Sequence, residues 1–410
     1  MKAILKHFVL MVFLLSAGSF AVKSQDWPQW RGENRDGKAP GFMVPDNWTG
    51  ELKEIWRTSV GTGDATPALV NDQLYVFTRQ DGKEVLLCLD ARTGKEIWKS
   101  AGYPAAEITG PAASHPGPRS SPAVSEGKVI TLGIGGDIAC FDAANGNLKW
   151  RFEEYKGQVP RFNTGMSPIV VKGMCIANLG GPESGYYIAL DLESGKVIWK
   201  TAGEGPPYGS PVLMTLGNNL QVVFQAQTKI MGLNAKNGDK LWEFPTPAGE
   251  GRVNNASSPV VVGNIIYHTG LNNGLNAVQI INRDDGFQVQ KLWSNPDIST
   301  SFNTPVYKDG FLYGINNRGK LFCVNAENGQ TAWIDEYSNQ NLGSVVDAGT
   351  VIVALSGKSE LIVFKPDPNV YSQSALIKVS DTPVYAHPVL SGNRIFVKDS
   401  DSVVLYSPGK

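Results

Sequence analysis

The chain has 410 residues, of which 42% are hydrophobic and 18% are charged, and its net charge at pH 7 is −1. This composition is typical of a folded, water-soluble protein and excludes a disordered tail protein. A near-neutral charge also argues against nucleic-acid binding, because a surface that neutralises phosphates must be basic. The 45 glycines and 25 prolines indicate many turns, which favours an all-β chain.

The first residues have the layout of a secretory signal. Two lysines precede an apolar run, Phe8 to Leu15, which is too short for a typical membrane-spanning helix. We expect cleavage before Gln25 and removal of residues 1–24, with an uncleaved anchor as the alternative. The first cysteine is Cys88, so we expect no lipid-modified N-terminal cysteine. The mature protein is expected to be exported, periplasmic or extracellular, with no transmembrane segment.

Residues 25–52 follow this signal and contain Trp27, Trp30 and Trp48, which are too many large aromatic residues for a plain linker. We expect this Trp-rich segment to pack across one face of the domain formed by residues 53–410. A partner-binding arm is the alternative. The domain opens with residues 53–60 (KEIWRTSV), which we expect to form a single β-strand.

The rest of the chain repeats with a period of roughly 40–50 residues. One half of the repeat is an Asp or Asn, followed by a Gly four positions later and a Trp after four more. Five copies share this spacing: Asp90-Gly94-Trp98, Asp142-Gly146-Trp150, Asp191-Gly195-Trp199, Asn234-Gly238-Trp242 and Asn325-Gly329-Trp333. The other half is a Ser-Pro or Thr-Pro before a β-branched run. With two variants it gives eight starts, at Thr66, Ser121, Ser167, Ser210, Ser258, Thr304, Ser344 and His387.

Each unit reads as four short strands separated by Gly- or Asn-containing turns. Four-stranded units at this period are the signature of a β-propeller, because radial stacking covers both faces of each twisted sheet. The last unit begins at His387 and ends one strand short, and residues 53–60 supply the missing strand. The sequence therefore predicts an all-β fold, an eight-bladed β-propeller of four-stranded antiparallel blades closed by an N-terminal strand.

The Asp, Gly and Trp spacing, with a small residue two positions before the Asp, resembles the tryptophan-docking repeat of pyrroloquinoline-quinone-type propellers. The small positions are Cys88, Cys140, Ala189, Gly232 and Cys323. The segments DWPQWRG (residues 26–32) and GPRSSP (residues 117–122) are also similar to exported bacterial members of this group, including proteins similar to outer-membrane assembly factor B. The resemblance implies that each Trp packs against the neighbouring blade and that the small residue leaves room for it.

The four cysteines are expected to be buried and unpaired. Three of them occupy the same small position on different blades, and a disulfide needs Cα atoms within about 7 Å of each other. The fourth, Cys175, lies inside a different predicted strand.

The activity is left open by these residues. The quinoprotein dehydrogenases that the repeat resembles carry an adjacent Cys-Cys disulfide and often a haem domain, whereas this sequence has neither a Cys-Cys pair nor a C-x-x-C-H motif. It also has no metal-ligand, nucleotide-binding or nucleophile motif. We expect no cofactor and no metal. Pyrroloquinoline quinone with calcium is expected only under the alternative function, a smaller form of the quinone-dependent dehydrogenases that oxidises alcohols or sugars.

A candidate binding site follows from propeller geometry. The loops that lead into the innermost strands gather at one mouth of the central channel, and here they carry amides, arginines and aromatic residues. Two insertions, residues 100–120 and 154–167, are expected to rise around this mouth. The predicted ligand-binding residues are Asp64, Arg119, Arg161, Asn163, Tyr208, Asn255, Asn303 and His387. The alternative is that these polar groups cap strand ends and hold channel water.

The sequence thus predicts a non-catalytic binding scaffold of the bacterial cell envelope. The expected partner is a peptide or protein held at the channel mouth or blade edges. We expect no nucleic-acid partner, and we expect a monomer. The alternative remains the quinone-dependent dehydrogenase, with the cofactor on the axis.

Overall fold

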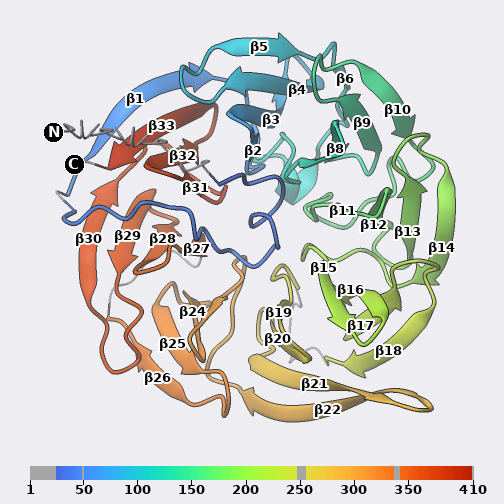
Figure 1. Ribbon diagram of the computed structural model, residues 1–410. Helices are drawn as coiled ribbons and strands as arrows, with labels where there is room; N and C mark the ends of the chain where they lie inside the picture. The colour runs from blue at the N-terminus through green and yellow to red at the C-terminus, as the bar shows by residue number, and fades with distance from the viewer. Residues whose placement is uncertain (1–24, 49, 247–254, 337–341, 409–410) are drawn as a thin grey trace, which may run out of the picture.

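The computed structural model describes residues 25–48, 50–246, 255–336 and 342–408, and the predicted signal, residues 1–24, lies outside the described residues. Eight antiparallel sheets stand around one axis as the blades of a propeller (Figure 1). The predicted all-β, eight-bladed fold is therefore confirmed. Within the described ranges the helical structure is limited to one 3-10 turn, η1 (Gly110–Ala112).

The first four blades each use four consecutive strands, counted outward from the axis. Blade 1 has β2 (Ala68–Val70), β3 (Gln73–Gln80), β4 (Lys83–Asp90) and β5 (Glu96–Lys99), and the short β6 (Tyr103–Pro104) also pairs with β4. Blade 2 has β7 (Ala123–Ser125), β8 (Lys128–Leu132), β9 (Ile138–Asp142) and β10 (Leu148–Phe152). Blade 3 has β11 (Ile169–Val171), β12 (Met174–Gly180), β13 (Gly185–Asp191) and β14 (Val197–Gly203). Blade 4 has β15 (Val212–Leu216), β16 (Asn219–Gln225), β17 (Lys229–Asn234) and β18 (Lys240–Pro245).

The remaining blades repeat this order until the last one. Blade 5 has β19 (Val260–Val262), β20 (Ile265–Thr269), β21 (Leu275–Arg283) and β22 (Gly286–Asn295). Blade 6 has β23 (Val306–Lys308), β24 (Phe311–Ile315), β25 (Leu321–Asn325) and β26 (Thr331–Ile334). Blade 7 has β27 (Gly343–Asp347), β28 (Ile352–Ser356), β29 (Glu360–Phe364) and β30 (Gln373–Lys378). Blade 8 has β31 (Val389–Ser391), β32 (Arg394–Lys398) and β33 (Ser402–Pro408), followed by β1 (Leu52–Ser59) as its outer strand.

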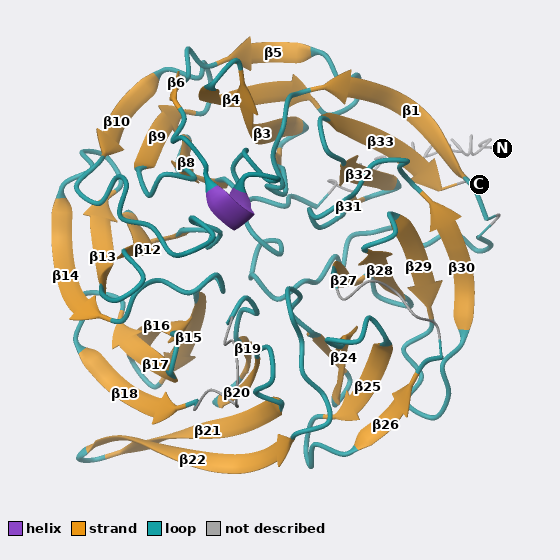
Figure 2. Cartoon of the chain, turned by 180° about the vertical axis from the view of Figure 1, so that it is seen from behind, coloured by secondary structure: helices purple, strands orange, loops and turns teal. Residues whose placement is uncertain are grey.

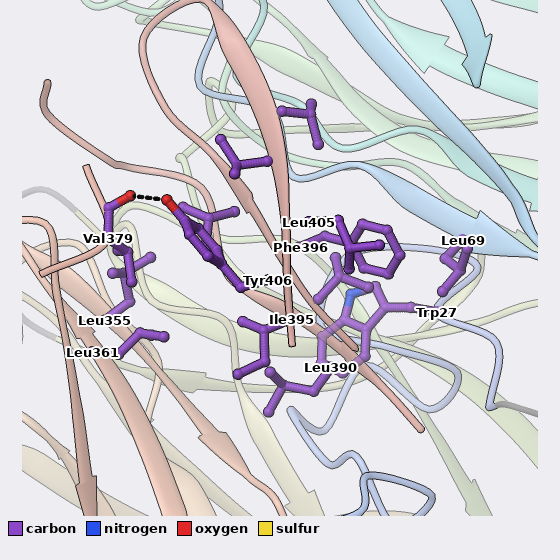
Figure 3. Close-up of a cluster of buried hydrophobic side chains, with 14 of the residues drawn as sticks. Trp27, Leu69, Leu355, Leu361, Val379, Leu390, Ile395, Phe396, Leu405 and Tyr406 are labelled. Atoms are coloured by element: carbon purple, nitrogen blue, oxygen red, sulfur yellow. Dashed lines mark hydrogen bonds between the residues drawn. The ribbon is translucent and has the colours of Figure 1, made fainter. Parts of the chain in front are cut away.

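The ring is closed by pairing the two ends of the chain. β1 pairs antiparallel with β33, as the unfinished last repeat predicted. The Arg57 guanidinium also donates to Asp399 Oδ2 at 3.0 Å, across the same sheet. The apolar cluster beneath this closure joins blades 7, 8 and 1, and Figure 3 shows Leu355, Phe396 and Leu69 among its members. The first and last blades are therefore held by the same kind of core as any other neighbouring pair.

The recurring Gly and Trp meet between neighbouring blades. A Cβ at Gly195 of blade 3 would lie 2.6 Å from Cδ2 of Trp150 in blade 2. The Trp150 indole also donates a hydrogen bond from Nε1 to the Leu192 carbonyl at 3.0 Å. Within its own blade, Trp150 lies opposite the small residue Cys140. The repeat spacing thus encodes a clamp in which one Trp fills the space left by a Gly and a small residue.

All four cysteines are buried and free of disulfide bonds, as predicted. Burial raises the pKa of the Cys88 and Cys140 thiols to about 12. These groups stay protonated at neutral pH, because an apolar environment disfavours the thiolate.

The Ser/Thr of the second half-repeat forms a hydroxyl ring around the axis. In five blades the hydroxyl of this Ser or Thr accepts a hydrogen bond from the backbone N–H of the corresponding blade-start residue in the preceding blade. The bonds run Ser121 to Ser167 at 2.9 Å, Ser167 to Ser210 at 2.9 Å, Ser210 to Ser258 at 3.0 Å, Ser258 to Thr304 at 2.8 Å and His387 to Thr66 at 2.9 Å. These N–H groups sit at buried strand starts, so the hydroxyls supply partners that the sheets themselves do not.

Residues 25–48, the N-terminal arm, run over one face of the disc to its centre (Figure 1). Trp27 is fully buried and exchanges backbone hydrogen bonds with Leu69 of blade 1. Farther along, Ala39 N donates to Asp347 O in blade 7 at 2.8 Å, and Met43 N donates to Gly392 O in blade 8 at 2.7 Å. The arm therefore binds the face on which the innermost strands turn into the second strands, which we call the arm face.

Two buried arginines of the arm reach from this face to the hydroxyl ring. The Arg31 guanidinium donates to Thr304 O at 2.7 Å and to Pro305 O at 2.8 Å, in blade 6. The Arg35 guanidinium donates to the Ser167 and Pro168 carbonyls of blade 3 at 2.8 and 2.9 Å. Burial lowers the pKa of Arg31 to about 10 and that of Arg35 to about 9, so both remain charged at neutral pH. Carbonyl dipoles thus take the place of carboxylate partners.

Candidate functional site

The predicted mouth lies on the opposite face, which we call the mouth face. Loops entering the innermost strands gather there, and the insertion at residues 100–120 carries η1 close to the axis (Figure 2). The arm occupies the axis on the other side, with Trp30 Nε1 donating to Ser258 Oγ at 3.2 Å. A ligand at the centre therefore has the mouth face as its surface of approach.

One group of mouth residues is built around Asp64 and His115. His115 Nδ1 lies 2.7 Å from Asp64 Oδ2, and the His115 ring packs edge-on against Tyr385 with centroids 4.8 Å apart. The Arg119 guanidinium donates to the carbonyl oxygens of His115 (3.1 Å) and Phe162. Burial lowers the pKa of Arg119, and the negative charge of Asp64 opposes this shift. Arg119 therefore fastens two loops together and adds positive charge to the mouth.

A second group lies beside it, between blades 3 and 4. Arg161 is exposed, and its guanidinium lies over the Phe162 ring at 5.4 Å. The Tyr208 hydroxyl accepts a hydrogen bond from Phe162 N at 3.1 Å, and burial raises the pKa of this tyrosine. Asn163 has a positive φ of 62° and donates to Ile134 O at 3.4 Å. Arg161, Phe162 and Tyr208 border a hollow of about 340 Å³, whose walls also include Pro160, Glu183, Pro206 and Asn255.

Three of the predicted residues are buried and bonded to the protein itself. Asn255 Nδ2 donates to Ala226 O at 2.7 Å, and Asn303 Nδ2 donates to Ile315 O at 2.7 Å. His387 packs edge-on against Trp30 of the arm, with ring centroids 4.4 Å apart. Burial, with a smaller contribution from the Arg31 charge, holds the pKa of His387 well below its usual range.

The eight predicted residues therefore fall into two sets. Asp64, Arg119, Arg161, Asn163 and Tyr208 share the mouth face with His115, whereas Asn255, Asn303 and His387 are buried. The Asn255 and Asn303 amides bond to carbonyls at the ends of β16 and β24, and Asn255 also lines the hollow between blades 3 and 4. Ligand binding by the first set stays a prediction. Two further features of this face are its exposed aromatic residues, Phe302 (50% exposed) and Tyr385 (38% exposed). Their sequence signal is their position just before a blade start.

Sequence reasoning missed a buried charged group at the edge of the mouth. Lys398 is almost fully buried, and its ammonium donates to Asp399 O at 2.8 Å and Gly61 O at 3.2 Å. Burial lowers its pKa to about 8, opposed by acidic groups that include Asp64. The repeat does mark this lysine, because the equivalent strand positions of other blades, such as Phe77 and Leu132, carry neutral residues.

Calcium is held by several oxygen ligands, so a calcium-bound quinone needs a cluster of oxygen-bearing side chains beside the axis. In the ranges that the structure describes, no group of three or more His, Cys, Asp or Glu side chains could hold a metal ion. Asp64 is engaged by His115, and the axis beneath the hydroxyl ring is filled by Trp30 and Arg31 of the arm. The described residues therefore do not fit a calcium-bound quinone on the axis.

No helix among the described residues is both long and apolar enough to span a bilayer. This finding concerns residues 25–408 apart from the short gaps within that range.

The comparisons with known proteins agree with the repeat and the fold. The chain is 26% identical over 237 residues to the outer membrane protein assembly factor BamB of Shewanella oneidensis, covering 54% of this chain and 58% of that protein. It is also 29% identical over 168 residues to the quinohemoprotein alcohol dehydrogenase ADH-IIG of Pseudomonas putida, covering 40% of this chain and 23% of the enzyme. The chain spans about three fifths of the length of the curated BamB relatives from Shewanella oneidensis and Burkholderia pseudomallei.

Solved structures show the same fold. The crystal structure of BamB from Moraxella catarrhalis superposes with a TM-score of 0.65 at 14% identity, covering 87% of this chain and 97% of that one. A family model described as outer membrane protein assembly factor BamB matches residues 46–213 and 185–335. Because these matches cover well over half of the chain, it belongs to the BamB-type family of quinoprotein-like propellers.

Proposed function

We propose that this propeller is a non-catalytic scaffold of the bacterial cell envelope that takes part in outer membrane protein assembly by holding a protein partner on its mouth face. The observation that carries the proposal is that the mouth face exposes Arg161, Phe302 and Tyr385 and has a hollow between blades 3 and 4. Relatives in the same family are named as outer membrane protein assembly factors, which supports the cellular role.

The chemistry of the mouth face suits a protein partner. Aromatic residues and arginines contribute much of the binding energy in protein interfaces. Aromatic side chains bury large areas with few rotatable bonds, and the arginine guanidinium forms several hydrogen bonds. Phe302 and Tyr385 expose aromatic rings, and Arg161 adds an exposed guanidinium beside Glu183. A partner segment with apolar side chains could pack against the aromatic rings, and an acidic or basic side chain of that segment could pair with Arg161 or Glu183.

The loops of this face are also held in place before any partner binds. Arg119 ties Phe162 to His115, and Tyr208 accepts the N–H of Phe162. Pre-ordered loops lose less conformational entropy on binding, so more of the contact energy appears as affinity.

The arm face offers a larger hollow with different chemistry. It has a volume of about 990 Å³, lies between the arm and blades 1 and 2, and is open to solvent. Its charged lining is acidic, from Asp26, Glu33, Glu126 and Asp142. Two of these carboxylates already accept backbone hydrogen bonds, Asp26 from Asn71 N and Asp142 from Ala144 N. We therefore place the partner on the mouth face rather than in the larger hollow.

Photocrosslinking tests the proposal directly. A photoreactive residue in place of Phe302 should crosslink to an envelope protein, whereas the same residue in place of Met43, exposed on the arm face, should not. Arg161→Glu should abolish the Phe302 adduct, while Lys149→Glu on the outer strand of blade 2 should retain it. Adducts of equal yield from both faces, or from the arm face alone, would contradict the placement.

The cellular role has its own test. Cells that lack this protein should contain less folded outer membrane protein, and the wild-type chain should restore the amount whereas the Arg161→Glu chain should not. An unchanged outer membrane in the deletion strain would reject the assembly role.

A quinone-dependent dehydrogenase is the second candidate, favoured by the similarity to the Pseudomonas putida enzyme over 40% of this chain. Purified protein incubated with pyrroloquinoline quinone and calcium should show no bound-quinone absorbance and no dye-linked oxidation of alcohols or sugars. Turnover above that of the free cofactor would replace the scaffold proposal.

A further inference from the structure

Two acidic side chains are buried together at the seam between blades 1 and 2. Glu84 on β4 and Asp137 in the β8–β9 turn are both almost inaccessible to solvent. Both carboxyl groups lie against Gly133, where an added Cβ would collide with Glu84 Oε2 and lie 2.8 Å from Asp137 Oδ1. Glu84 Oε1 accepts a hydrogen bond from Ile134 N at 2.7 Å. Glu84 Oε2 and the facing Tyr103 hydroxyl have no well-aligned partner in the described structure.

Positive charge near the pair comes from two arginines. Arg151 donates from Nε to Asp137 Oδ2 at 3.0 Å and shares its guanidinium with the more exposed Glu153, at 3.2 Å. Arg79 lies opposite Glu84 in the β3–β4 register, but its guanidinium is turned to backbone carbonyls. The titratable and charged groups that face Glu84 are therefore Arg79 from β3, Tyr103 from β6, Asp137 from the β8–β9 turn and Arg151 from β10.

This arrangement favours a proton on the pair. Two ionised carboxylates at one buried site repel each other, and neither is fully solvated. Burial raises the pKa of Glu84 to about 7, with a smaller increase from the charge of Asp137. The Ile134 N–H, the Tyr103 hydroxyl and Arg151 oppose the shift without cancelling it.

Glu84 also supports the insertion that carries mouth residues. On the outer edge of β4, Glu84 pairs with Tyr103 of β6, the short strand near the start of residues 101–119. The neighbouring Arg79 donates to Ala106 O at 3.2 Å and Pro116 O at 2.9 Å, in the same insertion. The end of the insertion bonds to the mouth, because Pro118 O accepts a hydrogen bond from Asp64 N at 2.9 Å. The seam therefore anchors the segment that positions His115 and Arg119.

We propose that the proton held by Glu84 beside Asp137 is a pH-sensitive latch, which fastens residues 101–119 to the seam in mildly acidic medium and loosens them as the pH rises to neutrality. When the segment opens, Glu84 meets water and releases its proton at the ordinary pH for a glutamic acid, whereas in the closed state it keeps the proton. Opening therefore releases a proton and becomes more favourable as the pH rises, until the closed state also loses the proton near pH 7. The latch goes beyond the proposed scaffold function and needs no partner to be tested.

Hydrogen exchange of the full-length protein measures the latch. Between pH 4.5 and 7, the opening constant of peptides from residues 101–119 should increase on the order of 100-fold after correction for intrinsic exchange, and it should level off above pH 7. A peptide that spans Phe311 to Asn325 in blade 6 should change little. A profile for residues 101–119 that is flat, or parallel to the blade 6 profile, would overturn the proposal.

Matched variants identify the group that titrates. Glu84→Gln keeps the size and the acceptor for Ile134 N, so the corrected opening constant should become independent of pH. Glu153→Gln removes the exposed acid on the same arginine and should retain the wild-type profile. Asp137→Asn removes the neighbouring charge and should shift the plateau to lower pH, which provides the test if Glu84→Gln does not fold. A pH-dependent profile in Glu84→Gln, or its loss in Glu153→Gln, would assign the effect elsewhere and refute the latch.

Discussion

Replacing a single repeat glycine should measure how much the clamp between neighbouring blades contributes to stability. Gly238 has a φ of +76°, and a Cβ at this position would lie 2.7 Å from Trp199 Cδ2 and 2.8 Å from Thr201 Oγ1. Trp199 belongs to the preceding blade and donates from Nε1 to Ala235 O at 3.1 Å. Gly173 offers a matched control, because its φ is +72° and its Cβ would meet nothing within 4 Å.

The expected costs separate into two parts. An alanine in the left-handed region costs about 1 kcal/mol at either position, because its Cβ crowds its own backbone. At Gly238 the new methyl must also displace a buried indole, and such overpacking costs a further 1–3 kcal/mol or so. We therefore expect Gly173→Ala to lower the free energy of unfolding by about 1 kcal/mol and Gly238→Ala to lower it by about 2–4 kcal/mol.

Denaturant unfolding followed by circular dichroism gives both values, provided that the transitions are reversible and have equal slopes. A double-mutant cycle with Trp199→Ala sharpens the test, since Gly238→Ala should then cost only about 1 kcal/mol. Equal costs for Gly238→Ala and Gly173→Ala in the wild-type background would refute the reasoning, because the contact with Trp199 would then contribute nothing.

Three other predictions concern closure, the arm and the thiols. A chain that begins at residue 50 should melt above one that begins at residue 61, because only the first retains β1 and closes blade 8; equal melting temperatures would argue against closure by this strand. Arg31→Ala removes buried bonds to Thr304 O and Pro305 O, so hydrogen exchange in residues 25–44 should increase at least tenfold while blade 4 stays protected; unchanged exchange would show that the arm is held by other contacts. Titration without reductant should find four reactive thiols after denaturation and almost none in the native protein, and two or fewer after denaturation would indicate a disulfide between any of Cys88, Cys140, Cys175 and Cys323.

The blade architecture could be predicted because the contacts between blades repeat with the sequence. In three of the five repeats the Trp meets the Gly of the next unit: Trp98 meets Gly146, Trp150 meets Gly195 and Trp199 meets Gly238. The outer strand of the last blade was also predictable. The last repeat lacks a fourth strand, residues 53–60 precede the first repeat as a single strand, and this segment does pair with β33. The recurring Ser/Thr was visible in the sequence, but its bonding was not predictable, because its hydroxyl bonds to a backbone group one blade away.

The sequence predicted which face of the propeller carries the candidate site, but not which side chains point toward solvent there. Loops before the innermost strands do share one face, but side-chain direction separated Arg161, which faces solvent, from Asn255 and Asn303, which turn inward to bond strand carbonyls. The path of the arm to the axis could not be predicted from the sequence. Arg31 and Arg35, which hold the arm there, bind backbone carbonyls, and such partners leave no complementary side chain in the sequence. The Glu84 seam was invisible for a similar reason, since its partners come from four separate elements.

The arm and β1 make the assembly of this propeller depend on contacts between distant parts of the chain. Gln25 O accepts a hydrogen bond from Ser391 Oγ, 366 positions away, and Arg57 meets Asp399 across 342 positions. Residues 25 and 57 thus bond to partners that are synthesised 366 and 342 positions later, so the ring closes only after blade 8 has been made. Such distant pairing slows folding and leaves sheet edges open in the interval. A chaperone that shields the early blades would therefore matter more for this chain than for a propeller closed within a single repeat.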